Sequence, residues 1–460
     1  MSTIRIGSRT SIKRRLSVAF CLAAFGIQIV PHAAGAQGST PADARIAAMV
    51  AAVSPQRLRA TDERLVAFGT RNLYSDPTNK TRGVGAARDW LVAQFKTIAE
   101  NSGGRMSVRV QQYLQPKNDR IVRPVEVASV LATLRGDDPE AGIVIISGHY
   151  DSRDSDGSDP LGDAPGADDN GSGTCAVLEA ARVMAHQHFR ATIVFAEYDG
   201  EEQGLFGSSY HAKTLHAAGA TIEGMLNNDI IGTSIGHDGV RRPNGVRIFS
   251  EALAAKSDPR RVNYAGNESD SPSRELARFV KESAEEYVPP MRADLIYRAD
   301  RWGRGGDHQS FNAEGYPAIR FAEPDETWEH QHQSPRIENG IEYADLIKFM
   351  DFDYLARVTR MNVAGAAALA LGPPRPAHVT LLARGFTYDT ILAWKPVPSA
   401  TGYELVWRAF TDPTWMHARA LGNVTTVNAK DLNKDDYIFG IRSVNAAGLR
   451  SPVVFPTPIR

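Results

Sequence analysis

Cysteine is nearly absent from this chain of 460 residues, which contains only Cys21 and Cys175. Cys21 lies in a segment that we expect to be removed, so the mature chain would hold one cysteine and no intrachain disulfide. Cys175 stands in an apolar, helix-like stretch, where a buried structural cysteine is the expected role rather than a nucleophile. Stability must therefore come from sources other than disulfides, such as a packed core.

Net charge is also nearly absent, because 52 lysine and arginine residues are balanced by 53 aspartate and glutamate residues. A chain without a basic or acidic excess gives no reason to expect nucleic acid or an anionic membrane surface as a partner. The length predicts two or three domains with ample chain for a large core.

Long hydrophobic runs are scarce, and the clearest one lies near the N-terminus at residues 16–30. Basic residues from Arg5 to Arg15 precede it, and the small residues Ala34, Gly35 and Ala36 follow it. This pattern predicts a signal peptide over residues 1–36 and export to the periplasm or the medium. An uncleaved membrane anchor is the alternative. No later segment has the length of a transmembrane helix, so we expect no integral membrane segment after cleavage.

Short apolar runs alternate with helical patterns through most of the chain. The runs at residues 127–134, 142–147 and 191–196 read as buried strands, whereas residues 81–100 and 174–186 have helical spacing. Residues 41–68 and 341–371 are also expected to be helical. The alternation predicts an α/β fold, with a mixed, largely parallel sheet sandwiched by helices.

The last part of the chain has a different pattern. Residues 372–376, Gly-Pro-Pro-Arg-Pro, are expected to break a helix and to form a linker. Short β-like runs follow at residues 391–394, 403–407 and 437–441. They predict a C-terminal all-β sandwich over residues 377–460. Trp394, Tyr403, Tyr437 and the turn at residues 445–448 resemble a fibronectin type III module, for which the sequence indicates no partner.

Acidic residues and histidine gather just beyond the expected strands. His149 and Asp151 follow the run at 142–147, and the Glu201-Glu202 pair follows the run at 191–196. Open α/β sheets place their functional sites beyond the carboxyl ends of the strands. The candidates are completed by Asp168, Asp169, Asp229, His330 and His332. Any one of these groups alone would more often be a turn, a helix cap or a solvated loop.

Together these residue types suit a hydrolytic site with two metal ions. Such a site needs imidazole and carboxylate ligands, one carboxylate that bridges the ions, and another that exchanges a proton with water. Alternate residues of extended chain point the same way, so Asp151 can orient His149. One of the two adjacent aspartates can bridge, and the Glu201-Glu202 pair can divide into a base and a ligand.

These motifs, with residues 66–71, 83–88 and 307–311, resemble the secreted bacterial leucyl-aminopeptidase type of co-catalytic dizinc exopeptidase. Relatives of that type include aminopeptidase Y and glutamate carboxypeptidase II. The resemblance runs from about residue 58 to residue 371, and it implies the zinc exopeptidase fold for a domain at residues 37–371. It also implies two Zn²⁺ ions as cofactors.

The resemblance further implies a role for each matching residue. One zinc would be bound by His149 and Asp229, and the other by Glu202 and a late histidine. Asp169 would bridge the ions, Glu201 would be the general base, and Asp151 would orient His149. Asp307 and His308 match a Ser-Asp-His segment that supports the pocket in relatives, although Gly306 replaces the serine.

The late histidine is a choice between two residues. Relatives often place it in a His-Thr context, whereas this chain has His330-Gln331-His332-Gln333-Ser334. The distance from the segment at 315–318 favours His332, and His330 is the alternative.

The predicted function is a metallo-aminopeptidase that removes N-terminal residues from peptides or proteins. A water molecule that bridges the metals, activated by Glu201, would attack the scissile carbonyl. The enzyme alternatives are a glutaminyl cyclase, which shares the fold and uses one catalytic zinc, and a carboxypeptidase of the same fold. A catalytically dead binding protein with a dominant fibronectin-like module is the alternative from another class. The complete set of ligands and base argues against it.

Overall fold

The computed structural model describes residues 43–254 and 257–460. The expected signal peptide at residues 1–36 lies outside the described residues. Within the described part, no helix combines the length and the apolar character needed to cross a bilayer.

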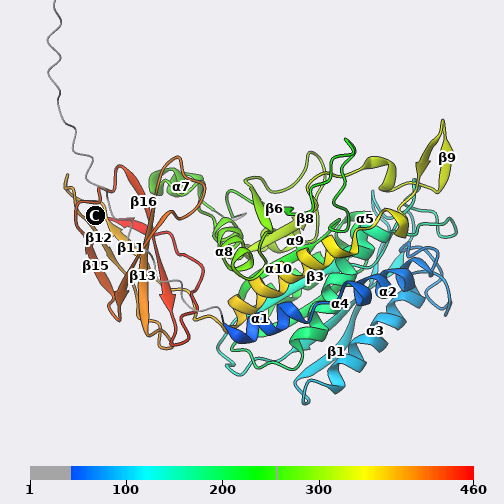
Figure 1. Ribbon diagram of the computed structural model, residues 1–460, viewed down its shortest axis with the longest axis horizontal. Helices are drawn as coiled ribbons and strands as arrows, with labels where there is room; N and C mark the ends of the chain where they lie inside the picture. The colour runs from blue at the N-terminus through cyan, green and yellow to red at the C-terminus, as the bar shows by residue number, and fades with distance from the viewer. Residues whose placement is uncertain (1–42, 255–256) are drawn as a thin grey trace, which may run out of the picture. The chain divides into compact units, whose positions relative to one another are not determined.

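A mixed sheet of eight strands forms the centre of the fold (Figure 1), in the order β1-β2-β4-β3-β5-β8-β6-β7. Its strands are β1 (Met106–Gln115), β2 (Val125–Leu134), β3 (Ile143–His149), β4 (Thr192–Tyr198), β5 (Ile222–Asn228), β6 (Gly245–Ser250), β7 (Arg292–Ile296) and β8 (Ala318–Ala322). The neighbours β4-β3, β3-β5, β5-β8 and β6-β7 are parallel, and the other pairs are antiparallel. The predicted mixed α/β fold is therefore confirmed.

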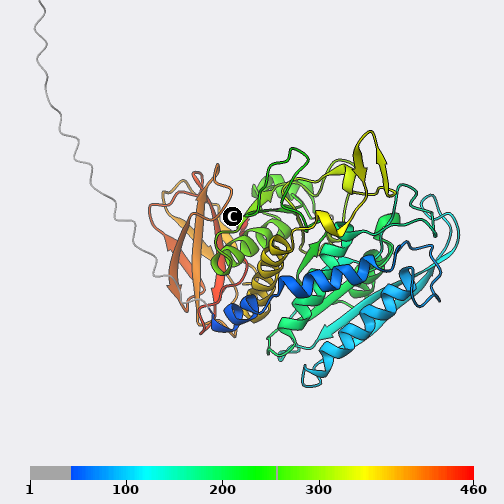
Figure 2. The same ribbon diagram turned by 45° about the vertical axis from the view of Figure 1, so that its right-hand side comes forward.

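Helices cover both faces of this sheet. The helices of the described residues are α1 (Ala44–Ala51), α2 (Pro55–Val66), α3 (Val84–Glu100), α4 (Gly173–Met184), α5 (Glu201–Gly204), α6 (Phe206–Ala217), α7 (Pro259–Ala265), α8 (Pro272–Tyr287), α9 (His308–Ala313) and α10 (Phe352–Leu371), of which α7 lies near the C-terminal strands in Figure 1 rather than on the sheet. Figure 2 shows α1 beside α10, and α10 also packs on α4. Alternate residues of β3 divide between two cores. Val144 and Ile146 join the core under α4 and α10, and Ile145 joins the core that contains residues of α6 and α9.

The register of the central strands brings the predicted site together. His149 at the end of β3 pairs with Tyr198 at the end of β4, and Ser147 pairs with Asn227 on β5. Since β3, β4 and β5 are parallel neighbours, the residues that follow them emerge at the same edge of the sheet. Cys175 is buried in α4, as predicted.

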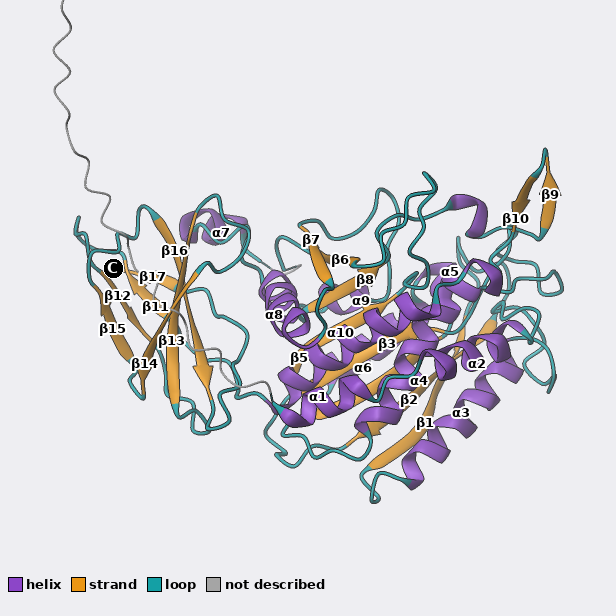
Figure 3. Cartoon of the chain, in the orientation of Figure 1, coloured by secondary structure: helices purple, strands orange, loops and turns teal. Residues whose placement is uncertain are grey.

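The expectation of a helix over residues 341–371 is wrong for its first part. Strands β9 (Arg336–Glu338) and β10 (Ile341–Tyr343) form a hairpin, which projects from the rest of the fold in Figure 3. A 3-10 turn (Ile347–Phe349) follows, and α10 begins only at Phe352. The carboxylate of Asp351 accepts a hydrogen bond from Tyr354 N and so caps α10 at this point.

Two smaller sheets form at the C-terminal end, where the sequence predicts strands. One has the order β15-β12-β11-β17 and the other the order β14-β13-β16. Their strands are β11 (Thr380–Leu382), β12 (Thr390–Ala393), β13 (Gly402–Ala409), β14 (His417–Gly422), β15 (Thr426–Ala429), β16 (Tyr437–Val444) and β17 (Thr457–Ile459). Both sheets contribute to one hydrophobic cluster around Trp394 and Tyr403. The likeness to a fibronectin type III sandwich stays a prediction.

Buried charges join this C-terminal region to α8. The carboxylate of Asp270 accepts from Arg278 of α8 at 2.9 Å and from Arg408 of β13 at 2.6 Å. Trp415 Nε1 donates to Glu275 of α8 at 2.8 Å. All three members of the Asp270 cluster are buried, so loss of the single carboxylate would leave two guanidinium groups without a shared partner.

We therefore expect Asp270→Ala to lower the free energy of unfolding by about 3–5 kcal/mol, because it leaves the buried Arg408 without a carboxylate partner, whereas Arg278 keeps its ion pair with Glu275. Urea unfolding followed by tryptophan fluorescence measures the change. Asp435, an exposed aspartate of the C-terminal region, provides the control. Asp435→Ala should stay within about 0.5 kcal/mol of the wild type. An equally small effect of Asp270→Ala would contradict a stabilising role for the cluster.

Candidate metal centre

His149 ends β3 with its side chain buried in the edge of the sheet. Its Nε2 atom has no hydrogen-bond partner in the described part of the chain. It faces carboxylate oxygens of Asp169 at 3.4 Å, Asp229 at 3.8 Å and Glu201 at 3.9 Å. These separations are too long for hydrogen bonds. Two ligand atoms that each lie about 2.0–2.1 Å from a tetrahedral zinc are about 3.3 Å apart, so the longer separations here are within about 0.6 Å of that arrangement.

Asp151 connects two of the strand ends. Its Oδ1 lies 3.4 Å from His149 Nδ1, and its backbone oxygen lies 3.2 Å from the same nitrogen. The carboxylate also accepts from Glu201 N at 3.3 Å and from Glu202 N at 3.2 Å. One buried side chain therefore orients the imidazole after β3 and the first turn of α5 after β4.

Asp168 and Asp169 lie in the turn that enters α4 and point in different directions. Their backbone amides donate to the two carboxylate oxygens of Asp345, at 2.8 and 2.7 Å. Asp168 accepts from Gly232 N, away from His149. Asp169 is the one that faces the site, with Oδ1 toward His149 and Oδ2 at 2.9 Å from His332 Nε2. The structure thus resolves which of the two aspartates stands between the histidines.

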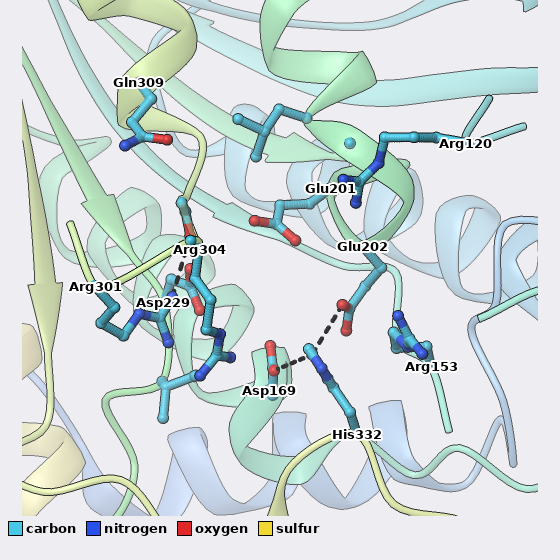
Figure 4. Close-up of a pocket in the computed structure, with 15 residues that line it drawn as sticks. Arg120, Arg153, Asp169, Glu201, Glu202, Asp229, Arg301, Arg304, Gln309 and His332 are labelled. Carbon is cyan, nitrogen blue, oxygen red and sulfur yellow. Dashed lines mark hydrogen bonds and ion pairs between the residues drawn. The ribbon is translucent and has the colours of Figure 1, made fainter. Parts of the chain in front are cut away.

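His332 and Glu202 form the second half of the site. His332 Nε2 lies 3.0 Å from Glu202 Oε2, as well as close to Asp169 (Figure 4). His330 is elsewhere, stacked on Phe349 with ring centroids 3.6 Å apart. Of the two candidate histidines, only His332 reaches the cluster.

The described residues contain two groups that have the geometry of metal sites. One comprises His149, Glu201 and Asp229, and the other comprises Asp169, Glu202 and His332. In each group the ligand atoms lie within 4.8 Å of one another. Asp169 also approaches His149, so one of its carboxylate oxygens faces each group. Imidazole and carboxylate ligands in two adjoining sets suit zinc.

The electrostatics of the site also favour cations. Burial lowers the pKa of His332, but Glu202 and Asp169 outweigh it and raise that pKa to about 11. Burial raises the pKa of Glu201 well above its ordinary value, with Asp229 adding to the rise and His149 opposing it. Carboxylates packed this closely in a buried site repel one another unless positive charge separates them.

Arg320, which the sequence reading missed, supports Asp229 from behind. It is fully buried in β8, and its Nε lies 3.0 Å from Asp229 Oδ2. Its other nitrogens contact Asp300 Oδ1 at 2.9 Å and the backbone oxygen of Asp229 at 3.1 Å. Burial raises the pKa of Asp229, but Arg320 and His149 hold it below its ordinary value. An arginine inside the apolar run at 318–322 is a sequence signal for such a pair.

Two other parts of the support lie near the site. His308 Nε2 lies 2.8 Å from the backbone oxygen of Ala299 and 3.7 Å from Asp300, so it reaches Asp229 only through Asp300 and Arg320. Asp307 is buried beside it. Buried Arg71 donates to backbone oxygens of Tyr150, Pro165 and Gly166, and so holds the loops that carry Asp151 and Asp169. Neither His308 nor Arg71 is a candidate metal ligand.

A mixed α/β sheet that carries two imidazole–carboxylate groups at the carboxyl ends of its strands is typical of zinc-dependent hydrolases. Comparisons with known proteins narrow this class. The family model described as "Peptidase family M28" matches residues 129–352.

Relatives extend over nearly the whole chain. A "Probable zinc metalloprotease" of Leptosphaeria maculans is 44% identical over 419 residues, which cover 90% of this chain and 97% of the relative. Another of the same description, from Pyricularia oryzae, is 43% identical and covers 90% of this chain and 85% of its own. The LapA aminopeptidase of Legionella pneumophila has a similar fold, with a TM-score of 0.50, 21% identity, and coverage of 71% of this chain and 74% of that one. The chain belongs to peptidase family M28 and is a zinc metallopeptidase.

Replacement of Arg320 by methionine should weaken zinc binding about 10–100-fold, because Asp229 loses the partner that fixes its position and stabilises its negative charge. Competition with a chromophoric chelator measures the affinity, and circular dichroism checks that the variant is folded. Arg320→Lys keeps the positive charge but loses the planar guanidinium group. Its zinc affinity should therefore lie between that of the wild type and that of Arg320→Met.

Arg247→Met is a matched control, since Arg247 pairs with Glu326 and touches neither metal-site group. Its zinc affinity should equal that of the wild type. A folded Arg320→Met protein with unchanged zinc affinity would exclude the supporting role.

Proposed function

We propose that this protein is an exported aminopeptidase with two zinc ions, which hydrolyses the N-terminal bond of peptides or proteins. The observation that carries the proposal is the position of Asp169 between His149 and His332. The consecutive residues Glu201 and Glu202 lie beside these histidines. The LapA aminopeptidase shares the fold, although fold alone does not determine the substrate.

In this proposal the ligands divide between the two ions. His149 and Asp229 would hold one zinc, Glu202 and His332 would hold the other, and Asp169, which lies between the two histidines, would serve both. Zinc, when bound, would polarise the scissile carbonyl and lower the pKa of water to about 7. The protein supplies the remaining chemistry through fixed side chains.

Glu201 is the proposed general base. It lines the same cavity as the ligands, and its backbone is held by Asp151. From there its carboxylate can take a proton from the attacking water and return it to the departing amine. Asp151 keeps the His149 ring in position while this happens.

The flanking regions enter the proposal as predictions. Residues 1–36 would direct export to the periplasm or the medium, and residues 377–460 would form the fibronectin type III-like module after the linker at 372–376. The buried ion pairs of Asp270 with Arg278 and Arg408 support a module that is fixed to the rest of the chain rather than loosely tethered.

Glu201→Gln should lose about 10²–10⁴-fold in turnover of aminoacyl-nitroanilides, because the amide cannot accept the proton. It should keep two zinc ions, as measured by elemental analysis. Glu202→Gln is the matched comparison, and it should lose zinc because it removes a ligand carboxylate. Loss of zinc from Glu201→Gln would show instead that Glu201 is a ligand, since it lies in one of the two metal groups.

We expect two zinc ions per chain and loss of peptide hydrolysis when a chelator removes them, with recovery when zinc is returned. Mass spectrometry of unlabelled peptides identifies the end that is cleaved. Release of C-terminal residues would favour the carboxypeptidase. One zinc per chain with cyclisation of N-terminal glutamine would favour the glutaminyl cyclase.

A further inference from the structure

Arginine lines the cavity that contains the metal-site residues. The cavity has a volume of about 550 Å³, and its lining includes Arg120, Arg153, Arg301 and Arg304. In Figure 4, Arg120 and Arg153 lie on the side of Glu202, and Arg301 and Arg304 lie on the side of Asp229. Leu205 and Ile230 are the only leucine, isoleucine, valine, methionine or aromatic residues among the described lining residues. Such a wall is poorly suited to a large apolar side chain.

Two of these arginines already have carboxylate partners. Arg301 NH1 lies 2.7 Å from Glu326 Oε2, and its Nε lies 3.0 Å from Asp300 Oδ1. Arg304 NH1 lies 3.2 Å from the same Glu326 oxygen. Structural pairing is enough to explain their presence.

Arg120 and Arg153 are held differently. Arg120 Nε donates to the backbone oxygen of Gln203 at 2.5 Å, and Arg153 donates to backbone oxygens of Asp154 and Ser155 at 3.1 and 3.2 Å. In the described residues neither guanidinium forms an ion pair with a carboxylate. Backbone oxygens fix the position of a guanidinium group without cancelling its charge.

The surrounding chain makes room for both side chains. A Cβ atom on Gly204 would lie 3.0 Å from Arg120 Nε, and a Cβ atom on Gly157 would lie 3.0 Å from Arg153 Cζ. The Arg153 loop is also tied to the segment after His332. Ser334 Oγ donates to Asp154 Oδ2 at 2.7 Å, and Ser334 N donates to Ser155 Oγ at 3.0 Å. The position of Arg153 is therefore coupled to the second half of the metal site.

The balance of charge decides what these arginines can bind. The acidic residues of the lining, Asp169, Glu201, Glu202 and Asp229, all belong to the two metal-site groups. Two divalent zinc ions would offset those four carboxylates, and the cavity would then remain positively charged. A guanidinium group binds a carboxylate through paired, charge-assisted hydrogen bonds.

We propose that Arg120 and Arg153 bind a carboxylate of the substrate, so that preferred peptides carry a carboxylate beside the scissile bond. It can belong to an acidic side chain on either residue of that bond or to the C-terminus of a dipeptide. The proposal deepens the proposed peptidase function and rests on it. The competing explanation is that both arginines only balance the charge of the metal site.

Three pairs of substrates, each a carboxylate and its neutral amide, separate the sources of the carboxylate. Glu-Leu-amide against Gln-Leu-amide tests the N-terminal side chain, and Leu-Glu-amide against Leu-Gln-amide tests the next side chain. Leu-Leu against Leu-Leu-amide tests the C-terminus. For at least one pair, we expect kcat/KM to be about tenfold or more higher for the carboxylate member. No preference for the carboxylate in any pair overturns the proposal.

Variants then assign the preference to the two arginines. Arg120→Gln and Arg153→Gln should each lower kcat/KM for the favoured carboxylate about tenfold, and leave its amide partner within about twofold. Zinc content should not change. Arg419→Gln is the control, because Arg419 is exposed on β14 of the C-terminal region. An equal loss for both members of the pair would support the charge-balance explanation and overturn ours.

Failure of the peptidase function has a separate signature, namely no hydrolysis of either member of any pair by zinc-loaded protein. Calorimetry with reduced-bond analogues of the same pairs then decides the matter, since it needs no turnover. Tighter binding of the carboxylate analogue, lost in the Arg120→Gln Arg153→Gln double variant, supports the arginine site. Equal binding of both analogues overturns it.

Discussion

The concentration of negative charge at the carboxyl edge of the sheet is the constraint on which the rest of this structure depends. Asp169, Glu201, Glu202 and Asp229 line one cavity, and Asp151 is buried directly beside them. Buried carboxylates this close are unfavourable unless cations and hydrogen-bond donors compensate them. The surrounding chain supplies part of that compensation, and zinc is the natural source of the remainder.

Compensation by the protein takes two forms. Backbone amides hold some carboxylates, as when Glu201 N and Glu202 N donate to Asp151, or Asp168 N and Asp169 N donate to Asp345. These bonds fix the loops that carry the carboxylates. Arg320 instead pairs with Asp229 from inside the sheet. Neither device uses the oxygens and nitrogens that face the cavity, so the metal-facing atoms stay available.

The arginines around the site differ in whether a carboxylate balances their charge. Arg301 and Arg304 share Glu326, and Arg320 is enclosed by Asp229 and Asp300, so these three are part of a balanced internal network. Arg120 and Arg153 stand outside that network, on the opposite side of the cavity. A metallopeptidase of family M28 that carries charge in this way would select substrates by electrostatics more than by apolar contact.

Much of this architecture could be predicted from local sequence. Buried strands such as β3 and β4 are continuous apolar runs, and apolar residues recur at helical spacing in α3 and α4. Such patterns can be read from the sequence because they depend only on residues that are close together in the chain. The prediction of a helix over residues 341–350 failed because apolar residues interspersed with charged ones do not by themselves distinguish a helix from a short hairpin and an irregular segment. Asp345 is used there to hold the Asp168-Asp169 turn, a contact between residues 176 or 177 positions apart.

The sequence by itself determined the class of the fold, the residue types of the metal site and their position just after the strands. It also carried the preference for Asp169 and His332, through family resemblance and spacing. Only the tertiary structure decided that His332 reaches the site while His330 stacks on Phe349, that Asp151 joins two strand ends, and that Arg320 lies behind Asp229. The physical reason is that strand and helix patterns are local, whereas these contacts depend on how distant segments pack and on which charges they bring together.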